Sequence, residues 1–266
     1  MSSRRATRSR GIPLLLVAPI AGAGALLGVP LVALIARAPW GELARELSSP
    51  EVLTALRLSL VCSLSATALS TLLGVPLAWL LARVDFPGRR LLRALVMLPM
   101  ILPPVVGGVA LLLAFGRRGL LGAWLDRAFD VQLPFTLAGA VLAETFVALP
   151  FLVIAAEAGF RQVDARLEQA AATLGATRLR VFARVTLPLA APALAAGAAL
   201  CWARALGEFG ATITFAGNLP GRTQTLPLAV YIALETHPEA AFAMSLVLLG
   251  VAIALLVALR ENWMGR

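Results

Sequence analysis

Lysine is missing from this 266-residue chain, and all 23 of its basic residues are arginine. A P-loop needs its lysine to reach the β- and γ-phosphates of a nucleotide, and Schiff-base catalysis needs a lysine amine. The chain therefore has neither kind of site. If the protein uses ATP, a separate polypeptide must bind it, so we expect ATP and Mg on a partner ATPase and no cofactor on this chain.

Cysteine and histidine are almost as scarce. Cys62 and Cys201 both lie inside apolar runs, and two cysteines at this spacing fit neither a disulfide scaffold nor a metal cluster. The single histidine, His237, cannot form a zinc site or a catalytic triad by itself. We find no Ser/His pair and no paired aspartates, so we predict no catalytic residue, no metal site and no enzyme.

Charge is also low, because only 14% of the residues are charged and 60% are hydrophobic, with a mean hydropathy of +0.88. A soluble domain has about 25% charged residues. The formal net charge of +9 suggests nucleic acid or a membrane surface as a partner. The arginines sit at the ends of apolar runs and form no stripe, which favours the lipid bilayer and argues against nucleic acid.

Long apolar runs dominate what is present. A helix that crosses about 30 Å of hydrocarbon needs about 20 mostly apolar residues. The chain offers six such runs, which predict a single all-α polytopic membrane domain over residues 1–266. The predicted spans are about 12–36, 58–82, 94–116, 131–156, 188–215 and 240–259.

Other features of the apolar runs refine this layout. The stretch Thr223–Leu234 is too short to span and is interpreted as an interfacial or re-entrant helix. Gly24 and Gly28 form a small-xxx-small pair, which we interpret as helix packing. The third span is predicted to be kinked or broken, because it contains Pro99, Pro103, Pro104, Gly107 and Gly108.

Arginine also predicts the orientation in the membrane. With the N-terminus inside, the inner connections and termini hold fifteen arginines and the outer connections hold six. Positive charge is enriched on the cytoplasmic side of membrane proteins. Both termini are therefore expected in the cytoplasm of a bacterial cell, with the protein in the inner membrane.

The inner connection from about residue 157 to 187 is the longest. Asp164 is a candidate N-cap, Gly175 suits the left-handed position after a helix, and Thr177 can cap a second helix, with a further helix beginning near Pro188. Ala170–Ala172 give the first helix a face of little bulk. Such a face can enter a groove on a partner, or the helix can lie on lipid with help from its arginines.

This connection resembles the EAA loop of ABC-importer permeases. Gln169-Ala170-Ala171, then Gly175, then Val185-x-Leu187-Pro188 fall at the family's spacing. The family usually has glutamate where Gln169 stands, and Glu168 is one residue earlier. The resemblance implies an ATPase-coupling loop whose residues are Glu168, Gln169, Ala170, Ala171, Gly175, Leu187 and Pro188.

The EAA resemblance carries further implications for fold and partners. It implies a type I ABC-importer permease fold that works as a homodimer. Cytoplasmic ABC ATPase subunits would hold the coupling loops, and an extracytoplasmic oxyanion-binding protein would deliver the substrate. ATP-driven alternating access would then expose the pathway to each side in turn.

The segment from Ala203 to Tyr231 is similar to the corresponding stretch of molybdate permeases and, less closely, of sulfate/thiosulfate permeases. This similarity implies import of molybdate, without separating molybdate from tungstate. A sulfate/thiosulfate permease is the nearest alternative. A stand-alone secondary anion transporter is the alternative from another class.

Polar residues in the fifth span are candidates for the translocation pathway or its gate. Arg204, Glu208 and Thr212 follow at i, i+4 and i+8, which predicts one shared helix face. Charged groups in spans are costly and face the bundle interior or a cavity, so Arg204 and Glu208 either line the pathway or pair internally to fix packing. Thr214 and Asn218 add milder hydrogen-bonding groups, and Glu144 is the lone charge of the fourth span.

Overall fold

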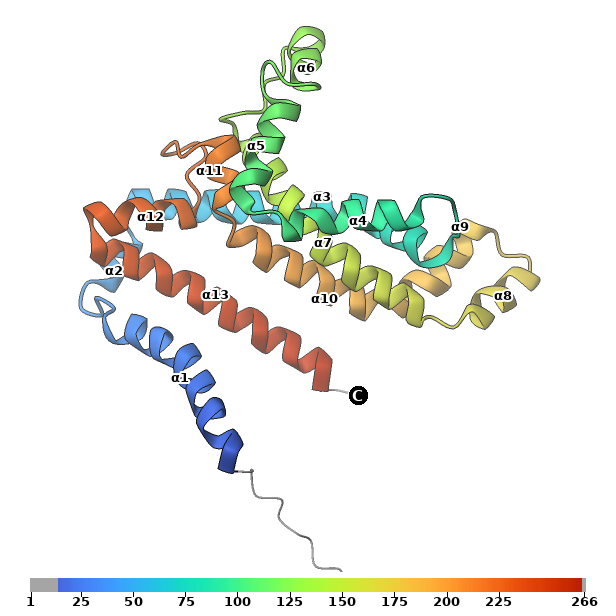
Figure 1. Ribbon diagram of the computed structural model, residues 1–266, viewed down its shortest axis with the longest axis horizontal. Helices are drawn as coiled ribbons and strands as arrows, with labels where there is room; N and C mark the ends of the chain where they lie inside the picture. Colours follow the sequence, from blue (N-terminus) through green and yellow to red (C-terminus); the bar gives the residue numbers. More distant parts are fainter. Residues whose placement is uncertain (1–13, 265–266) are drawn as a thin grey trace, which may run out of the picture.

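The computed structural model describes residues 14–264, and every regular element in that range is helical. The centre consists of three long helices packed along one another: α3 (Pro50–Arg83), α7 (Leu137–Gln162) and α10 (Leu187–Leu206) (Figure 1). Among these described residues, five helices are long and apolar enough to cross a membrane, or six if one bent pair of helices is counted as a single span. The predicted all-α polytopic architecture is confirmed.

Small residues let α7 and α10 approach closely. A methyl group at Gly159 would collide with Ala193, and one at Gly197 would lie 2.8 Å from the side chain of Ala155. Close backbone approach of this kind is how helices associate in lipid, where the hydrophobic effect gives no drive. Gly24 and Gly28, both in α1 (Leu14–Ala36), have no other described residue within 4 Å of a Cβ position, so the packing predicted for this pair is not seen among the described residues.

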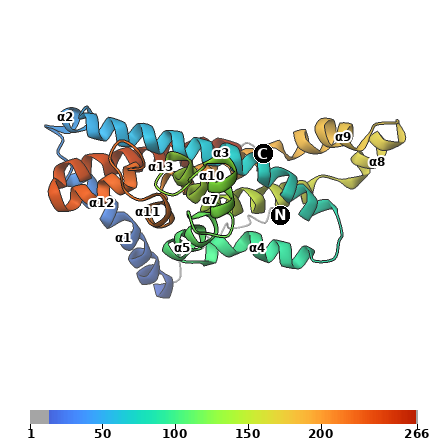
Figure 2. The same ribbon diagram turned by 90° about the horizontal axis from the view of Figure 1, so that it is seen from above.

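The third apolar run is broken, as its prolines predicted. The chain bends by 119° between α4 (Arg89–Ile101) and α5 (Pro104–Phe115). Leu102 is extended with ψ 136°, the conformation that a following proline favours. Figure 2 shows α4 along one edge of the molecule, where it packs against α7, and α5 leads to the short helix α6 (Gly122–Phe129).

The fifth predicted span, 188–215, is not one helix. The chain is helical from Arg178 through α9 (Arg178–Val181), a π-helical turn (Phe182–Thr186) and α10, and α10 then ends at Leu206. Gly207 interrupts the helix before α11 (Gly210–Ala216). Pro188 accounts for the π-helical turn, because it has no N–H for an ordinary helical bond to residue 184 and its ring crowds that carbonyl.

The other predicted bounds also shift. The fourth span begins at Leu137 instead of residue 131, because 131–136 form a non-helical connection that contains a turn with Phe135 at φ +59°. Thr136 ends this connection by accepting a hydrogen bond from Gly139 N and so caps α7. α7 continues to Gln162, so the predicted 157–187 connection shrinks to residues 163–177 between long helices. The second span lengthens, because Pro50 occupies the first turn and Ser49 caps it. The N-terminal arginines used for orientation lie outside the described residues.

The two ends of the molecule carry different elements. One end holds α2 (Leu43–Leu47), α12 (Leu226–Thr236) and the start of α13 (Pro238–Met264), and the opposite end holds α8 (Ala165–Thr173) and α9 (Figure 1). The short apolar stretch 223–234 thus forms α12, which packs against α13 and α3. Leu226 and Ala233 of α12 share one buried apolar cluster with Met244 of α13.

Candidate functional site

The helix α8 has the capping that its sequence predicted. The side chain of Asp164 accepts a hydrogen bond from Arg166 N at 2.9 Å and so caps the helix. Thr177 caps the following helix by accepting from Arg180 N at 3.4 Å. A side-chain oxygen at this position satisfies one of the backbone N–H groups left free at a helix start.

Gly175 ends α8 in the left-handed conformation, with φ of +85°. Its own N–H donates to Ala172 O at 3.0 Å, and the N–H of Ala176 donates to Ala171 O at 3.1 Å. These two bonds form a Schellman motif, which satisfies carbonyls that the helix end would leave free. Nothing lies within 4 Å of the position of a Cβ on Gly175, so backbone conformation alone selects glycine here.

The outer face of this loop is apolar and exposed. Ala170 and Ala172 lie in the solvent-facing part of α8, while Ala171 is half-buried. Leu174 is 89% exposed and Leu179 is 76% exposed. The alanine face was predicted from the sequence, but the two leucines were missed. They could have been found because they are apolar residues in a polar connection between spans.

Glu168 turns inward and Gln169 outward. Glu168 Oε1 lies 3.2 Å from a terminal nitrogen of Arg83 at the end of α3, and it accepts a hydrogen bond of 2.6 Å from Thr186 Oγ1. Gln169 is exposed. The glutamate one residue before the usual position therefore joins α8 to α3 and to the start of α10, and Gln169 is the one free to meet a partner.

Arg83 also fixes the beginning of the loop, because it donates to the carbonyl of Val163 at 2.7 Å. The far side of the loop is fixed by Phe182, whose ring meets those of Trp79 at 5.8 Å and Phe160 at 6.2 Å. Arg83 and Thr186 were missed by sequence reasoning. In the sequence, Arg83 is marked only by being a charge at the very end of a span, and Thr186 only by occupying the variable position before Leu187-Pro188.

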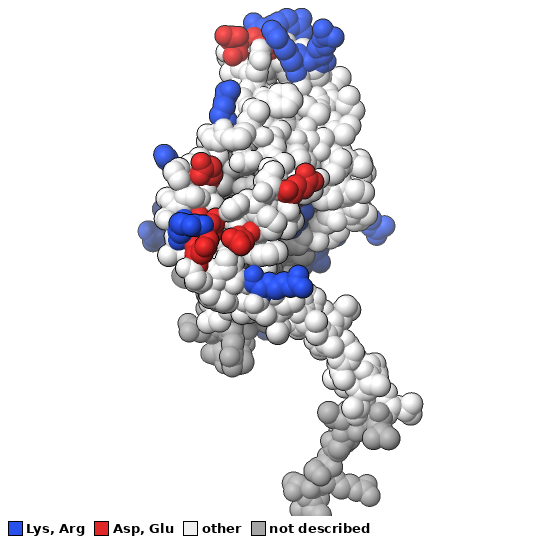
Figure 3. Space-filling model, turned by 90° about the vertical axis from the view of Figure 1, so that its left-hand side faces the viewer, with Lys and Arg blue, Asp and Glu red and all other residues white. Residues whose placement is uncertain are grey.

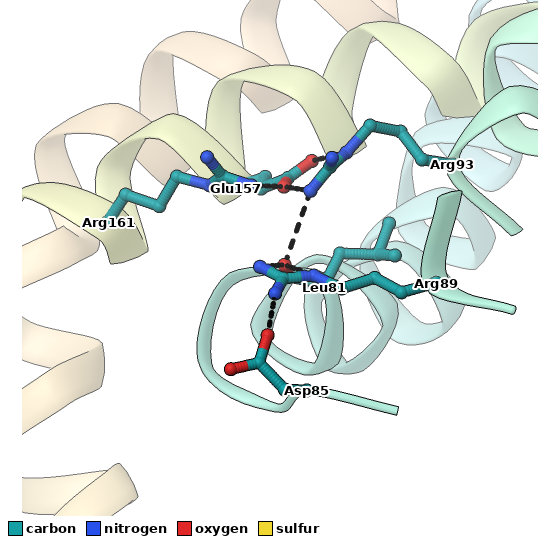
Figure 4. Close-up of polar contacts among 6 residues, drawn as sticks. All are labelled: Leu81, Asp85, Arg89, Arg93, Glu157 and Arg161. Carbon is teal, nitrogen blue, oxygen red and sulfur yellow. Dashed lines mark hydrogen bonds and ion pairs between the residues drawn. The ribbon is translucent and has the colours of Figure 1, made fainter. Parts of the chain in front are cut away.

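A second arginine–carboxylate cluster joins the same ends of the long helices (Figure 4). Glu157 of α7 pairs with Arg93 of α4 and, at 2.6 Å, with Arg161 one turn further on. Arg93 and Arg89 both donate to the carbonyl of Leu81 in α3, Arg89 through Nε at 2.9 Å. The ends of α3, α4 and α7 are thus tied together just before the loop begins.

The predicted helix face of Arg204, Glu208 and Thr212 does not exist, because the helix stops between the first two. Arg204 nevertheless pairs with Glu208 at 2.6 Å, since the backbone turns at the end of α10, where Glu208 N donates to Ala205 O at 3.0 Å. Glu208 Oε1 also accepts from Ala211 N at 2.7 Å, in the first turn of α11. Glu208 is 1% exposed, so it holds the start of α11 in a buried position against the end of α10.

The other polar candidates lie around this break. Thr214 Oγ1 donates to Gly210 O within α11 at 2.8 Å, and Thr212 Oγ1 and Asn218 Oδ1 are buried without hydrogen-bond partners in the described structure. Glu144 of α7 is 1% exposed, and its Oε2 also has no partner there. The structure thus places Thr212 and Thr214 on one short helix, with Glu208 in the break just before it, and leaves unsatisfied buried oxygens in and beside that helix.

α11 packs tightly against α5. A Cβ at Gly108 would lie 2.6 Å from the side chain of Thr214, and one at Gly210 would lie 2.9 Å from Pro104. The broken third span and the helix after the Gly207 break are therefore in contact. Two interrupted segments that meet near buried polar groups are typical of ion and substrate sites in transporters, where irregular backbone lines a cavity.

These features define a multi-pass membrane transport subunit, and comparison with known proteins agrees. The chain belongs to the family of binding-protein-dependent transport system inner membrane components, whose model matches residues 70–265. It is 50% identical to the molybdenum transport system permease protein ModB of Mycobacterium tuberculosis over 224 residues, 84% of each chain. It is 37% identical to the sulfate transport system permease protein CysT of Escherichia coli over 264 residues, 96% of this chain and 93% of that one.

The fold has a solved counterpart. The structure of a bacterial ABC transporter involved in the import of the acidic polysaccharide alginate superposes with a TM-score of 0.72, covering 93% of both chains at 18% identity. The predicted ABC-importer permease fold is confirmed, as is the prediction of a permease subunit and not an enzyme. The chain is a multi-pass inner membrane protein.

Proposed function

We propose that this chain is the subunit through which an ATP-driven importer carries molybdate into the cytoplasm by alternating access. The assignment of molybdate as substrate rests on the identity of 50% to a molybdenum permease over 84% of both chains, compared with 37% to a sulfate permease. The sulfate/thiosulfate branch is the second candidate, because its members align with almost the whole chain. The proposal includes tungstate as a substrate, because tungstate is a dianion of the same shape and charge as molybdate.

Energy must come from outside the chain. Moving a divalent anion into a cell with a negative interior costs about 2.3 kcal/mol per charge per 100 mV, or roughly 4–5 kcal/mol. The chain has no lysine for a P-loop, so ATP and Mg would be bound by a cytoplasmic ABC ATPase subunit. This argues against a stand-alone secondary anion transporter, as does membership of a binding-protein-dependent family.

We assign the docking of that ATPase to α8 and its neighbours. Ala170, Gln169 and Leu174 face solvent there, while Glu168 and Phe182 tie the same loop to the long helices. An exposed apolar surface held rigidly is suited to transmit movement of a partner to the bundle. Leu187 and Pro188 lie where this surface continues into α10.

The remaining partners follow from the same proposal. A second copy of the chain would complete the pathway, supported by the exposed apolar residues of α4, Leu91, Leu95 and Ile101. An extracytoplasmic oxyanion-binding protein would meet the end that holds α2 and α12, opposite the loop. Both termini would then face the cytoplasm, as the arginine distribution favours.

The pathway is proposed to run beside α11. Arg204 and Glu208 satisfy each other, which favours their interpretation as a structural pair that sets the position of α11. Thr212, Thr214 and Asn218 would then supply neutral hydrogen-bonding groups, which suit a path that must release its substrate after receiving it. Movement of α11 against α5 would open or close that path.

A null strain tests the substrate. Loss of the chain should abolish molybdoenzyme activity at low external molybdate, and high external molybdate should restore it. Growth on sulfate as sulfur source is the control and should be unaffected. A requirement for cysteine in the null strain, or equal uptake of sulfate and molybdate by the reconstituted importer, would instead assign the chain to the sulfate branch.

A further inference from the structure

Three side chains that can bind metal meet where α2 packs against the junction of α12 and α13. Glu46 belongs to α2, His237 ends α12, and Glu239 lies in the first turn of α13. One ligand atom from each lies within 4.8 Å of the others. The sequence predicts no metal site because its one histidine stands alone, whereas the fold brings a distant carboxylate to it.

The spacing of the first two ligands fits one tetrahedral ion. Zinc binds imidazole nitrogen and carboxylate oxygen at about 2.0–2.2 Å, which separates two ligands of a tetrahedron by about 3.4 Å. Glu46 Oε2 and His237 Nε2 are 3.5 Å apart. This distance is beyond that of a good hydrogen bond between such groups, so the pair is arranged as two ligands more closely than as donor and acceptor.

Among the described residues, the carboxylate of Glu46 has two long contacts, one with Arg45 and one with His237. The residue is 8% exposed. Its Oε1 receives Arg45 at 3.4 Å, but among residues 14–264 no hydrogen bond reaches its Oε2. Its Oε2 faces His237 Nε2 at 3.5 Å, and a cation between these two atoms would give the largely buried carboxylate a closely placed positive charge.

The backbone holds these ligands in place. His237 N donates to Ala233 O at 2.7 Å and His237 O accepts from Ala241 N, so the histidine is fixed to both helices. Glu46 O accepts from Ser49 N at 3.2 Å. Beside them lies a pocket of about 400 Å³, lined in part by Glu46 and His237, with room for an ion and its water.

The charge of this end of the molecule also favours a cation. Figure 3 looks onto it and shows acidic side chains gathered on the face. Glu42 is the N-cap residue of α2, Glu51 lies in the first turn of α3, and Glu235 lies in α12. Arg45 is engaged with Glu42 at 2.6 Å.

We propose that Glu46, His237 and Glu239 bind one divalent transition-metal ion of the zinc type, with water as the fourth ligand. Imidazole together with two carboxylates suits such an ion better than it suits magnesium or calcium, which prefer all-oxygen sites. The ion clamps α2, and with it the start of α3, to the junction of α12 and α13. This site is separate from the transport function proposed above and stands without it.

Metal binding to the purified full chain, carrying an affinity tag without histidine, tests the proposal. Equilibrium dialysis against Zn²⁺ should give one ion per chain, and Co²⁺ should give the intense visible absorption of a tetrahedral site. His237→Gln should weaken binding at least 100-fold, and Glu46→Gln or Glu239→Gln at least tenfold. Glu235→Gln is the matched control, one turn or less from the site and outside the ligand set, and should bind like the unaltered chain.

A second measurement separates binding from folding. Zn²⁺ should raise the thermal midpoint of the unaltered chain and of Glu235→Gln, because a ligand of the folded state stabilises it by mass action, and should leave that of His237→Gln unchanged. His237 is 59% exposed, so its replacement leaves the core intact. Binding by His237→Gln as tight as by the unaltered chain, or an octahedral Co²⁺ spectrum, would overturn the proposal.

Discussion

Arg83, the last residue of α3, and Glu168, in the first turn of α8, form an ion pair of 3.2 Å that links a long apolar helix to the loop that contains α8. The same guanidinium donates a hydrogen bond to the carbonyl of Val163, and the same carboxylate accepts a hydrogen bond from the hydroxyl of Thr186. A force applied to α8 is therefore passed directly to α3 and α10. The pair is partly exposed, so its value lies in geometry more than in raw stability.

Arg83→Ala should uncouple transport from ATP hydrolysis. The change frees α8 from α3 and leaves Glu168 with only its hydroxyl partner, so the complex should assemble but hydrolyse ATP with a much smaller uptake per ATP. Uptake and phosphate release measured together in proteoliposomes check this. Arg166→Ala, on the exposed face of the same helix, is the control; equal coupling in the two variants would contradict the prediction.

Gly175 should tolerate asparagine but not valine. A β-branched residue at φ of +85° costs roughly 1–2 kcal/mol or more, while asparagine enters this conformation more readily. Since the site has open space around it, any difference between the variants reports the backbone. ATPase co-purification should be lost in Gly175→Val and kept in Gly175→Asn. Loss in both would show that the left-handed turn is not what matters.

Leu174→Asp should abolish binding of the ATPase without affecting the fold, because Leu174 is 89% exposed. Burial of a leucine side chain contributes about 1.5–3 kcal/mol to an interface, and an unpaired carboxylate adds a further cost. Leu120→Asp provides the control, since Leu120 is equally exposed at 89% but precedes α6 and is distant from the loop. Pull-down of the ATPase from membranes distinguishes them. Retention by Leu174→Asp would move the docking surface elsewhere.

The Arg204–Glu208 pair can be tested by a double substitution. Arg204→Leu leaves a buried carboxylate, and breaking a buried pair in this way costs about 3–5 kcal/mol; the thermal midpoint should fall. Adding Glu208→Gln removes the unpaired charge and keeps an acceptor for Ala211 N, so both stability and uptake should recover. Recovered stability with no uptake would show that the charges line the pathway and are not only structural.

Composition and local spacing were enough for the class of fold. The missing lysine, the six apolar runs and the prolines at 99, 103 and 104 predicted a polytopic subunit with a broken third span. The caps at Asp164, Gly175 and Thr177 were readable because a cap depends on residues within a few positions of itself. These features depend on residues that are close together along the chain, so a single sequence is enough to predict them.

Tertiary structure decided which side chains meet. Gly207 ends α10 inside an apolar run, and periodicity alone predicted that the helix would continue. Arg83 finds Glu168, and Glu46 finds His237, through contacts between residues far apart in the chain. Such pairs depend on how whole helices pack, and packing is set by the small residues at the contacts between α7 and α10. The partner of a carboxylate such as Glu168 or Glu46 cannot be predicted from the sequence, because only helix packing decides which side chain lies beside it.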